Sequence, residues 1–165
     1  MSSSTPERRT AAVVTISDSS SRGEREDLSG PAVASLLEKR QFQVIAREVV
    51  PDEQATIEQV VRRLCQKAHF VVTTGGTGVA LRDVTPEATT AVCDRLIPGI
   101  AERMRLEGSA KTKFAALSRG VCGTRGQSVI LNLPGSPKGA VESLEAVVDL
   151  IPHALQLLRG DTAHK

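Results

Sequence analysis

The sequence has no tryptophan, no tyrosine and only three phenylalanines among its 165 residues. Its core must therefore be aliphatic, built from valine, leucine, isoleucine and alanine. Proteins that bind single-stranded nucleic acids commonly stack the bases on aromatic side chains. Because this chain offers almost no such platform, we expect no nucleic-acid partner.

An excess of charge of one sign is also lacking. Basic and acidic residues are mixed along the chain and the formal net charge is +2, which predicts no strong attraction to nucleic acids or acidic membranes. No apolar run approaches the roughly 18 residues of a membrane span. The first ten residues are polar and lack the apolar centre of a signal peptide. We therefore expect a cytoplasmic protein with no membrane partner.

Cysteine is scarce and shows no pairing pattern. Cys65, Cys93 and Cys122 are far apart and form no Cys-x-x-Cys motif, which indicates a reducing compartment and argues against a structural zinc site. Cys122 falls in a loop-like segment, where a catalytic nucleophile is conceivable and a bystander is the simpler interpretation. The three histidines show no metal-ligand spacing.

Length and composition indicate one globular domain. Hydrophobic residues make up 40% of the chain and charged residues 24%, and the length suits a single domain with a proper core. We expect a disordered arm over residues 1–9, the domain over residues 10–160 and a flexible tail over residues 161–165.

Short β-branched runs alternate with longer helical patterns along the domain. Strands are expected at residues 11–16, 42–50, 70–74 and 128–133. Helices are expected at residues 29–40, from 52–53 onward, and at 86–96, 98–107 and 138–158. Strands joined by helices favour a parallel or mostly parallel sheet with helices on both faces. The sequence therefore predicts a single α/β domain of three layers.

Some stretches are less regular. Residues 17–27 are polar and predict a long loop, whereas residues 111–125 give no clear pattern. Ser29 is expected to cap the helix at 29–40, and the helix at 138–158 is expected to be interrupted near Pro152.

The most informative stretch follows the third strand. It runs Thr73-Thr74-Gly75-Gly76-Thr77-Gly78 and continues with Arg82-Asp83-Val84-Thr85-Pro86-Glu87-Ala88. Glycines after a strand let backbone amides approach an anion. Thr85-Pro86 is typical of a helix start, with Thr85 as N-cap and Pro86 first in the helix. These features indicate a phosphate-handling site that could also hold a metal ion, with a purely structural turn as the alternative.

Polar segments follow all four expected strands. They are Ser17-Asp18-Ser19, Pro51-Asp52-Glu53, Thr74-Gly75-Gly76-Thr77-Gly78 and Pro134-Gly135-Ser136-Pro137. Ligands of parallel sheets bind beyond the carboxyl ends of the strands, so these segments should converge on one rim. The carboxylates of Asp52 and Asp83 would then share one site. Capping of the following helix is a strong alternative role for Asp52.

Six segments, in order along the chain, match a known family. They are Ser17-Asp18, Asp27-Leu28-Ser29-Gly30-Pro31, Val50-Pro51-Asp52-Glu53, the glycine run 74–78 with residues 82–88, Leu117-Ser118-Arg119-Gly120, and Leu133-Pro134-Gly135-Ser136-Pro137. Over about residues 10–160 the chain resembles the MogA/MoaB family of molybdenum cofactor biosynthesis. It is also similar to the G domains of the plant and animal counterparts.

The resemblance implies a molybdopterin adenylyltransferase, which transfers AMP from Mg-ATP to the terminal phosphate of molybdopterin and releases pyrophosphate. It implies a three-layer α/β fold and a homotrimer, with the molybdenum-insertion enzyme of the pathway as a further candidate partner. It also implies Mg²⁺, with ATP as co-substrate and no tightly bound organic cofactor. By motif, Asp83 matches the family's essential acidic residue and Asp52 a second one, and both are expected to be catalytic and to bind Mg²⁺.

Substrate-binding residues are expected in the matching segments. They are Ser17, Asp18, Thr74, Gly75, Gly76, Thr77, Gly78, Ser118, Arg119, Gly135 and Ser136. The glycine amides at 75, 76 and 78 are expected to donate to anions. Many relatives carry Asn at the position of Ser136.

Three cations are candidates to offset phosphate charge. They are Arg82, Arg119 and Lys138, and for Arg82 exposure to solvent is an equal alternative. The apolar helix face from Ile97 to Met104 is a candidate contact between protomers.

Two other functions stay open. One is a non-catalytic molybdopterin-binding carrier or scaffold of the same fold, and the other is a nucleotide-amide hydrolase related to the competence-damage proteins. The intact run from Arg82 to Ala88 favours the enzyme over the carrier, and no convincing base or nucleophile supports a hydrolase. The sequence does not specify molybdenum or tungsten use.

Overall fold

Six strands form the sheet that organises residues 8–161, the part of the chain that the computed structural model describes. The strands are β1 (Thr10–Ile16), β2 (Gln43–Val50), β3 (Phe70–Thr74), β4 (Arg95–Leu96), β5 (Cys122–Arg125) and β6 (Ser128–Leu133). Their order is β2-β1-β3-β6-β5-β4. The first four in this order run parallel, whereas β5 is antiparallel to β6 and β4 to β5. The prediction of a mostly parallel sheet is confirmed.

The central strands β1, β3 and β6 are buried along nearly their whole length. Successive side chains of a strand point to opposite faces of the sheet. In β1, Ala11 and Val13 therefore pack into one core, and Ala12 and Val14 pack into the other. This double burial explains why these strands appear in the sequence as continuous apolar runs without alternation.

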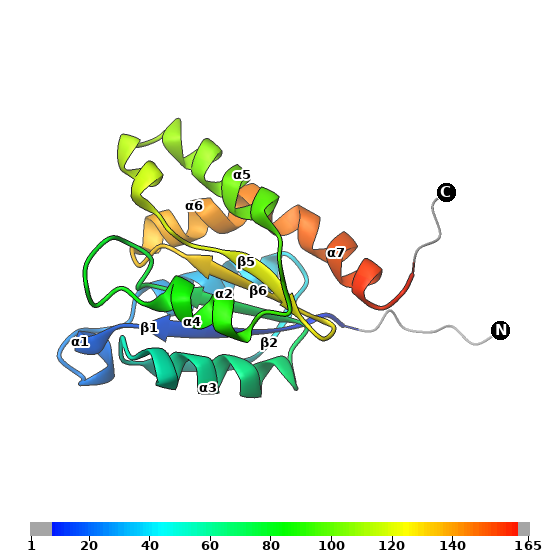
Figure 1. Ribbon diagram of the computed structural model, residues 1–165, viewed down its shortest axis with the longest axis horizontal. Helices are drawn as coiled ribbons and strands as arrows, with labels where there is room; N and C mark the ends of the chain where they lie inside the picture. The colour runs from blue at the N-terminus through cyan, green and yellow to red at the C-terminus, as the bar shows by residue number, and fades with distance from the viewer. Residues whose placement is uncertain (1–7, 162–165) are drawn as a thin grey trace.

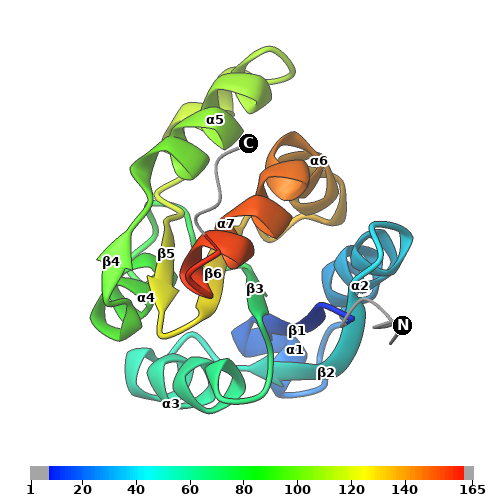
Figure 2. The same cartoon turned by 90° about the vertical axis from the view of Figure 1, so that its right-hand side faces the viewer.

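Helices cover both faces of the sheet (Figure 2). One face carries α2 (Ser29–Lys39), α5 (Pro98–Ser109), α6 (Pro137–Val147) and α7 (Ile151–Leu158). The other face carries α3 (Gln54–Cys65) and α4 (Thr85–Val92). The remaining short helices are α1 (Asp18–Ser21) and the 3-10 turns η1 (Lys113–Leu117) and η2 (Val148–Leu150). The three-layer α/β architecture is thus confirmed.

Several short elements were missed by the sequence prediction. The helix predicted over residues 86–96 ends at Val92 and is followed by β4, while residues 111–125 contain η1 and β5. Strands of two and four residues are too short for a periodic pattern to emerge. Cys122 accordingly begins a strand and does not lie in a loop. The predicted loop at 17–27 also contains the single turn of α1.

Of two predictions about the second half of the chain, one is confirmed and the other is wrong. The helix predicted at 138–158 is interrupted near Pro152 as expected, since η2 lies just ahead of that residue, which falls in the first turn of α7. Proline is tolerated there because the first turn of a helix has no acceptor for its missing N–H. The apolar face from Ile97 to Met104 packs inside the chain, since Ile100 and Met104 are buried in the core beneath α5 and α6.

The two ends of the described chain lie close together, at the amino-terminal edge of the parallel strands. The Thr10 amide donates to His69 Nδ1 at 3.2 Å, and Arg159 Nη2 lies 3.3 Å from His69 Nε2. Figure 1 shows the start of β1 and the end of α7 at one end of the molecule, with α1 at the other. The arm predicted for residues 1–9 and the tail for 161–165 fall largely outside the described residues. None of the helices within residues 8–161 is long and apolar enough to cross a membrane.

Candidate active site

The carboxyl ends of the four parallel strands meet at one edge of the sheet. Ile16 at the end of β1 pairs with Val50 at the end of β2, and Thr15 pairs with Thr74 of β3. Thr74 in turn pairs with Leu133 at the end of β6. The polar segments that follow these strands therefore lie side by side on this edge, as the parallel sheet requires.

Two cavities open at this edge. The first cavity, of about 430 Å³, is mainly built by the segments after β1, β2 and β3 and by the start of α6. Its lining includes the predicted residues Ser17, Asp52, Thr74, Gly75, Gly76, Asp83, Gly135 and Ser136. Among the remaining lining residues, the loop between α1 and α2 contributes the charged side chains Arg25, Glu26 and Asp27.

The second cavity, of about 720 Å³, lies between the loop after β3, η1 and the start of α6. Its lining includes the predicted residues Gly76, Thr77, Gly78, Asp83, Ser118, Gly135 and Ser136. Exposed apolar side chains form one hydrophobic side of this cavity, and the largest are Val79, Phe114 and Leu117. The two cavities share Gly76, Asp83, Gly135 and Ser136, so Asp83 stands at their junction.

Asp83 is held in a tight turn of the glycine loop, which we define as residues 75–84. Its amide donates to Ala80 O at 2.9 Å, and its Oδ2 accepts from the Ala80 amide at 3.2 Å. The turn fixes the backbone of Asp83 and one of its carboxylate oxygens. The carboxylate is therefore pre-positioned where the two cavities meet.

Glycine is required in this loop because carboxylates pack against its backbone. A Cβ on Gly76 would lie 3.0 Å from Asp52 Oδ1, and a Cβ on Gly78 would lie 2.8 Å from Asp83 Oδ2. Gly76 also has a φ of +68°, a conformation that other residues rarely adopt. The two glycines thus bring the backbone close to both predicted catalytic carboxylates.

One predicted anion donor in the loop is already used by the protein. The Gly75 amide donates to Leu133 O at 3.1 Å, which ties the loop to the end of β6. The expectation that Gly75 donates to a substrate anion is therefore wrong. Within residues 8–161, the amides of Gly76 and Gly78 donate no hydrogen bond, and they remain available to a ligand.

Asp52 is locked to Asp18 by reciprocal hydrogen bonds. The Asp18 amide donates to Asp52 Oδ2 and the Asp52 amide donates to Asp18 Oδ1, both at 3.0 Å. The predicted alternative that Asp52 caps α3 is wrong, because that helix has Glu53 as its N-cap residue and no side-chain capping bond. Asp52 instead joins the segments after β1 and β2.

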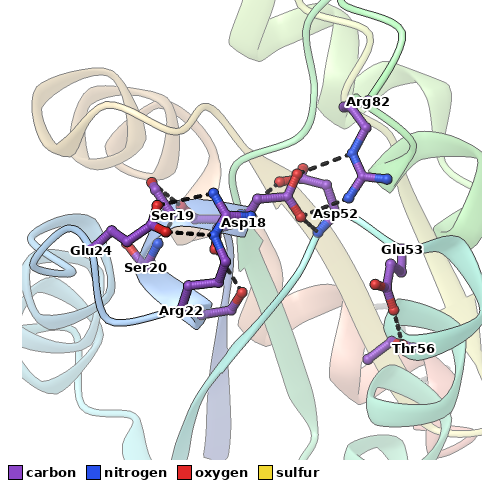
Figure 3. Close-up of polar contacts among 11 residues, drawn as sticks. Asp18, Ser19, Ser20, Arg22, Glu24, Asp52, Glu53, Thr56 and Arg82 are labelled. Atoms are coloured by element: carbon purple, nitrogen blue, oxygen red, sulfur yellow. Dashed lines mark hydrogen bonds and ion pairs between the residues drawn. The ribbon is translucent and has the colours of Figure 1, made fainter.

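Arg82 reaches from the glycine loop to Asp18, one member of this pair (Figure 3). Its Nε and Nη2 donate to the two carboxylate oxygens of Asp18 at 3.0 and 2.7 Å. The Asp18 side chain therefore lies between Arg82 and the Asp52 backbone, and it does not line either cavity. Its predicted role as a substrate contact is replaced by one of organising its neighbours.

The two aspartates differ in electrostatic environment. Burial raises the pKa of the Asp52 carboxyl above its ordinary value of 3.8, and the negative charges of Asp18 and Asp83 raise it further. The Arg82 guanidinium holds the pKa of Asp18 below its usual range. Asp52 and Asp83 line the same cavity, so one site holds two carboxylates of like charge.

Several predicted site residues already have partners within the protein. The hydroxyl of Thr74 donates to Pro134 O at 2.6 Å. The hydroxyls of Ser17 and Ser136 accept from the amides of Ser20 and Gly139 and so cap α1 and α6. All three residues line the first cavity. Ser17 and Ser136 place the N-termini of α1 and α6 beside it, and helix N-termini favour anions.

Two helix starts differ from their prediction. The amide of Gly30 in α2 is capped by Asp27 Oδ1 at 2.9 Å, so Ser29 is not the cap. Thr85 is the first residue of α4 and not its N-cap, and its hydroxyl donates to Gly75 O at 2.9 Å. Thr85 thus fastens α4 to the glycine loop.

The candidate phosphate cations occupy different settings. Arg119 lines neither of the two cavities and contacts the glycine loop from behind. Lys138 is exposed in the first turn of α6, outside the lining of both cavities. Arg82 is exposed and bound to Asp18, whereas Arg25, which the prediction omitted, lines the first cavity.

Asp27 is the clearest residue that the prediction missed. It lines the first cavity and accepts hydrogen bonds from the Thr15 hydroxyl at 2.8 Å and from the Gly30 amide. Its place two residues before the start of α2, in the polar segment after β1, was the available signal. In the second cavity, Lys111 and Glu142 were missed because residues 111–125 gave no pattern and α6 showed only a helical one.

The cysteines are unsuited to nucleophilic chemistry. Burial raises the pKa of the Cys122 thiol to about 12 and those of Cys65 and Cys93 to about 11. The thiolate is the reactive form, so these side chains stay protonated at neutral pH. The bystander interpretation of Cys122 fits its burial at the start of β5.

Within residues 8–161, no group of three or more His, Cys, Asp or Glu side chains forms a ready-made metal cage. Mg²⁺ commonly binds through one or two carboxylates together with substrate phosphates and water. Asp52 and Asp83, with hard oxygen donors in one cavity, fit that donor set. The site therefore suits a magnesium ion that arrives with a phosphorylated substrate.

A known protein family matches residues 12–153, and its model is described as a probable molybdopterin binding domain. The chain belongs to this family. The match spans most of the chain, and solved structures named MoaB and MogA, 51% and 38% identical, confirm the resemblance to those proteins.

Relatives of this protein are named as enzymes. The molybdopterin adenylyltransferase of Helicobacter pylori strain J99 is 43% identical over 153 residues, covering 90% of this chain and 87% of the relative. The molybdopterin adenylyltransferase of Escherichia coli K12 is 43% identical over 165 residues, covering 90% and 84%. Among solved structures, the molybdopterin biosynthesis enzyme MoaB of Thermus thermophilus superimposes with a TM-score of 0.87 at 51% identity, covering 92% and 97%.

Proposed function

We propose that this protein is a molybdopterin adenylyltransferase that transfers AMP from ATP to the terminal phosphate of molybdopterin. The observation that carries the proposal is the place of Asp83, at the junction of two cavities that are each large enough for a heteroaromatic substrate. A reaction between two phosphorylated molecules needs such a junction, because their phosphates must meet while their rings stay apart. The adenylyltransferase relatives support the same reaction.

The reaction is a displacement at phosphorus. An oxygen of the molybdopterin phosphate forms a bond to the α-phosphorus of ATP, and the bond from that phosphorus to the bridging oxygen breaks. Pyrophosphate leaves with the electron pair of that bond. The attacking phosphate is already ionised at neutral pH, so the site needs no strong general base.

Catalysis of this kind depends on positioning and on charge neutralisation. We propose that Asp83 and Asp52 would hold Mg²⁺, which would supply positive charge to offset that of the substrate phosphates. The unused amides of Gly76 and Gly78 and the N-terminus of α6 at Ser136 would bind phosphate oxygens. Each cavity would receive the ring system of one substrate.

The residues with internal partners would act on these groups indirectly. Asp18 would hold Asp52 in register, and Arg82 would add positive charge beside the pair. Gly135 lies next to the α6 cap and packs against Gly75, since a Cβ on it would lie 3.4 Å from Gly75 Cα. A side chain at 135 would therefore narrow the junction of the two cavities.

The remaining parts of the proposal rest on the family resemblance. They are a homotrimer, a cytoplasmic location and the molybdenum-insertion enzyme as a partner. The exposed apolar side chains of Leu81 and Leu106, which line neither cavity, offer surface that an assembly could bury. The reaction itself precedes the choice between molybdenum and tungsten.

The test is an AMP-transfer assay with purified protein, molybdopterin and Mg-ATP, in which pyrophosphate and adenylylated pterin are followed together. We expect Asp83→Asn to reduce transfer on the order of 100-fold or more, with the unfolding curve and molybdopterin binding close to wild type. Asp149→Asn is the matched control, because Asp149 is exposed in η2 and lies outside both cavities.

Near-normal turnover by Asp83→Asn would contradict its role as a metal ligand. Tight molybdopterin binding by the wild type without any product would instead indicate the carrier or scaffold function. Absence of both binding and product would refute the proposal that molybdopterin is the substrate.

A further inference from the structure

Arg119 contacts both ends of the segment that carries Asp83. Its backbone amide donates to Thr77 O at 2.8 Å, near the start of the glycine loop. Its guanidinium donates to Gly78 O at 2.7 Å through Nε and to Asp83 O at 2.8 Å through Nη2. The remaining nitrogen, Nη1, donates to the Glu87 carboxylate in the first turns of α4. One residue therefore ties the loop at its start, at Asp83 and at the helix that follows.

These contacts lie behind the loop and away from the substrate cavities. Arg119 lines a separate, smaller cavity of about 250 Å³ with residues of α5 and β5. All three guanidinium nitrogens already have acceptors in the protein. The sequence-based role of Arg119 as a substrate contact is therefore not the one that its geometry favours.

The segment that carries Arg119 is itself braced by a second arginine. Arg105 of α5 directs Nη1 to the carbonyls of Ser118 and Gly120, at 3.4 and 3.1 Å. These carbonyls flank Arg119 on both sides. The brace thus runs from α5 through residues 118–120 to the glycine loop, and it links a packed helix to the turn of Asp83 through hydrogen bonds.

We propose that Arg119 is a positioning residue that holds Asp83 at the junction of the two cavities. Arginine suits this role because its planar fork presents several donors in fixed directions, whereas lysine presents a compact point charge. A lysine could satisfy only part of the set formed by Gly78 O, Asp83 O and Glu87. The consequence for catalysis rests on the proposed adenylyltransferase function, but the effect on the loop does not.

The test compares Arg119→Lys with the matched control Arg103→Lys. Arg103 is an exposed arginine of α5 that also donates to a backbone carbonyl, Ala146 O of α6 at 2.7 Å, and neither residue belongs to the glycine loop. The first readout is amide hydrogen exchange over residues 76–87, followed at Ala80, Asp83 and Thr85, whose amides donate hydrogen bonds. This measurement requires no activity. We expect Arg119→Lys to accelerate exchange there at least tenfold while β1 and β3 keep wild-type protection, and Arg103→Lys to change neither.

The second readout is steady-state AMP transfer. A positioning role predicts a fall in kcat of about 100-fold, the size that misplacement by about 1 Å can cause. The KM values for molybdopterin and ATP should change much less than kcat, because Arg119 itself lines neither substrate cavity. Glu87→Gln, which leaves both carbonyl contacts of Arg119 in place, should show a smaller change of the same kind.

Three results would overturn the proposal. One is unchanged exchange over residues 76–87 in Arg119→Lys, and another is a raised KM with kcat preserved, which would mean that Arg119 touches substrate. The third applies if Arg119→Lys does not fold. In that case, Glu87→Gln with the same exchange rates and the same kcat as the wild type would overturn the proposal. A wild-type protein that transfers no AMP would refute the proposed function alone, and the exchange result would still decide the role of Arg119.

Discussion

Gly78 shows at the scale of a single residue how the backbone makes room for a functional group. Its missing side chain leaves the space that the Asp83 carboxylate occupies, and a Cβ there would lie 2.8 Å from Oδ2. That approach is closer than carbon and oxygen atoms tolerate. The glycine is therefore tied to the position of Asp83 and not merely to the turn of the chain.

Gly78→Ala should consequently impair turnover more than stability. We expect kcat for AMP transfer to fall about tenfold, because the Asp83 carboxylate must shift by a fraction of an ångström. Gly99→Ala is the control, since a Cβ at Gly99 in the first turn of α5 meets nothing within 4 Å. Wild-type kcat in Gly78→Ala would show that the position of Asp83 is not critical.

Asp52 and Asp18 illustrate how two neighbouring carboxylates acquire different properties. Asp18 is satisfied by an arginine, whereas Asp52 is partly buried and faces other negative charge. A carboxylate in the second setting gains most from a bound cation. This contrast supports Asp52 rather than Asp18 as the partner of Asp83 in metal binding.

At the scale of elements, a buried polar network joins α4 to the sheet. Asn132 of β6 donates from Nδ2 to the hydroxyls of Thr73 and Thr89, both at 2.9 Å, and its Oδ1 accepts from the Val121 amide. All four residues contribute to one connection between β3, β6, α4 and the segment before β5. The network is satisfied, since the described residues contain no buried side-chain polar atom without a partner.

Thr89→Val should weaken this connection. The substitution keeps the volume but removes one acceptor of the buried Asn132 amide, so we expect the free energy of unfolding to fall by about 1–3 kcal/mol. Thr90→Val, on the exposed side of the same helix, should change it by less than about 0.5 kcal/mol. Urea unfolding followed by far-UV circular dichroism measures both, and equal stability of the two variants would argue against the network.

The elements that could be predicted from the sequence are those whose signal is local and long enough. β1, β3 and β6 appear as β-branched runs, and the glycine loop with its charged pair is visible in the residue order alone. β4 and β5 could not be found in this way because they are short and depend on pairing with β6. The length of an element thus decided whether its sequence pattern was visible.

The site was predictable in its location but not in its connections. The parallel sheet placed the polar segments on one edge, which brought Asp52 and Asp83 into a single cavity. The partners of Asp18, Arg82 and Arg119 could not be anticipated, because each contact joins residues far apart in the sequence. Such contacts depend on side-chain reach across the folded edge and leave no periodic trace.

At the scale of the whole molecule, the three thiols are buried or half-buried. Their pKa values of about 11 to 12 lie above the ordinary value of 9.0, so the folded state binds more protons than the unfolded state above pH 9. The resulting stabilisation is complete below pH 9 and is lost as pH rises toward 11 to 12. The slope is at most about 1.4 kcal/mol per pH unit for each thiol.

We therefore expect the free energy of unfolding, measured in reducing buffer, to decline between pH 9 and pH 11. The decline should be shallower in the Cys65→Ala/Cys93→Ala double variant, whose remaining thiol is Cys122. The chain has no tyrosine whose ionisation would overlap this range. Parallel pH dependence in the two proteins would mean that the thiols titrate alike in the folded and unfolded states.

The meeting of Thr10 and Arg159 at His69 has a consequence for how the domain can be attached to other molecules. Both lie at the edge of the sheet opposite Asp83, so a molecule that binds beside Thr10 or Arg159 would leave the mouths of the two cavities uncovered. Two partner domains attached beside Thr10 and beside Arg159 would therefore lie next to each other. Such an arrangement would place the reacting phosphates on the outward face of a larger assembly, within reach of a neighbouring enzyme.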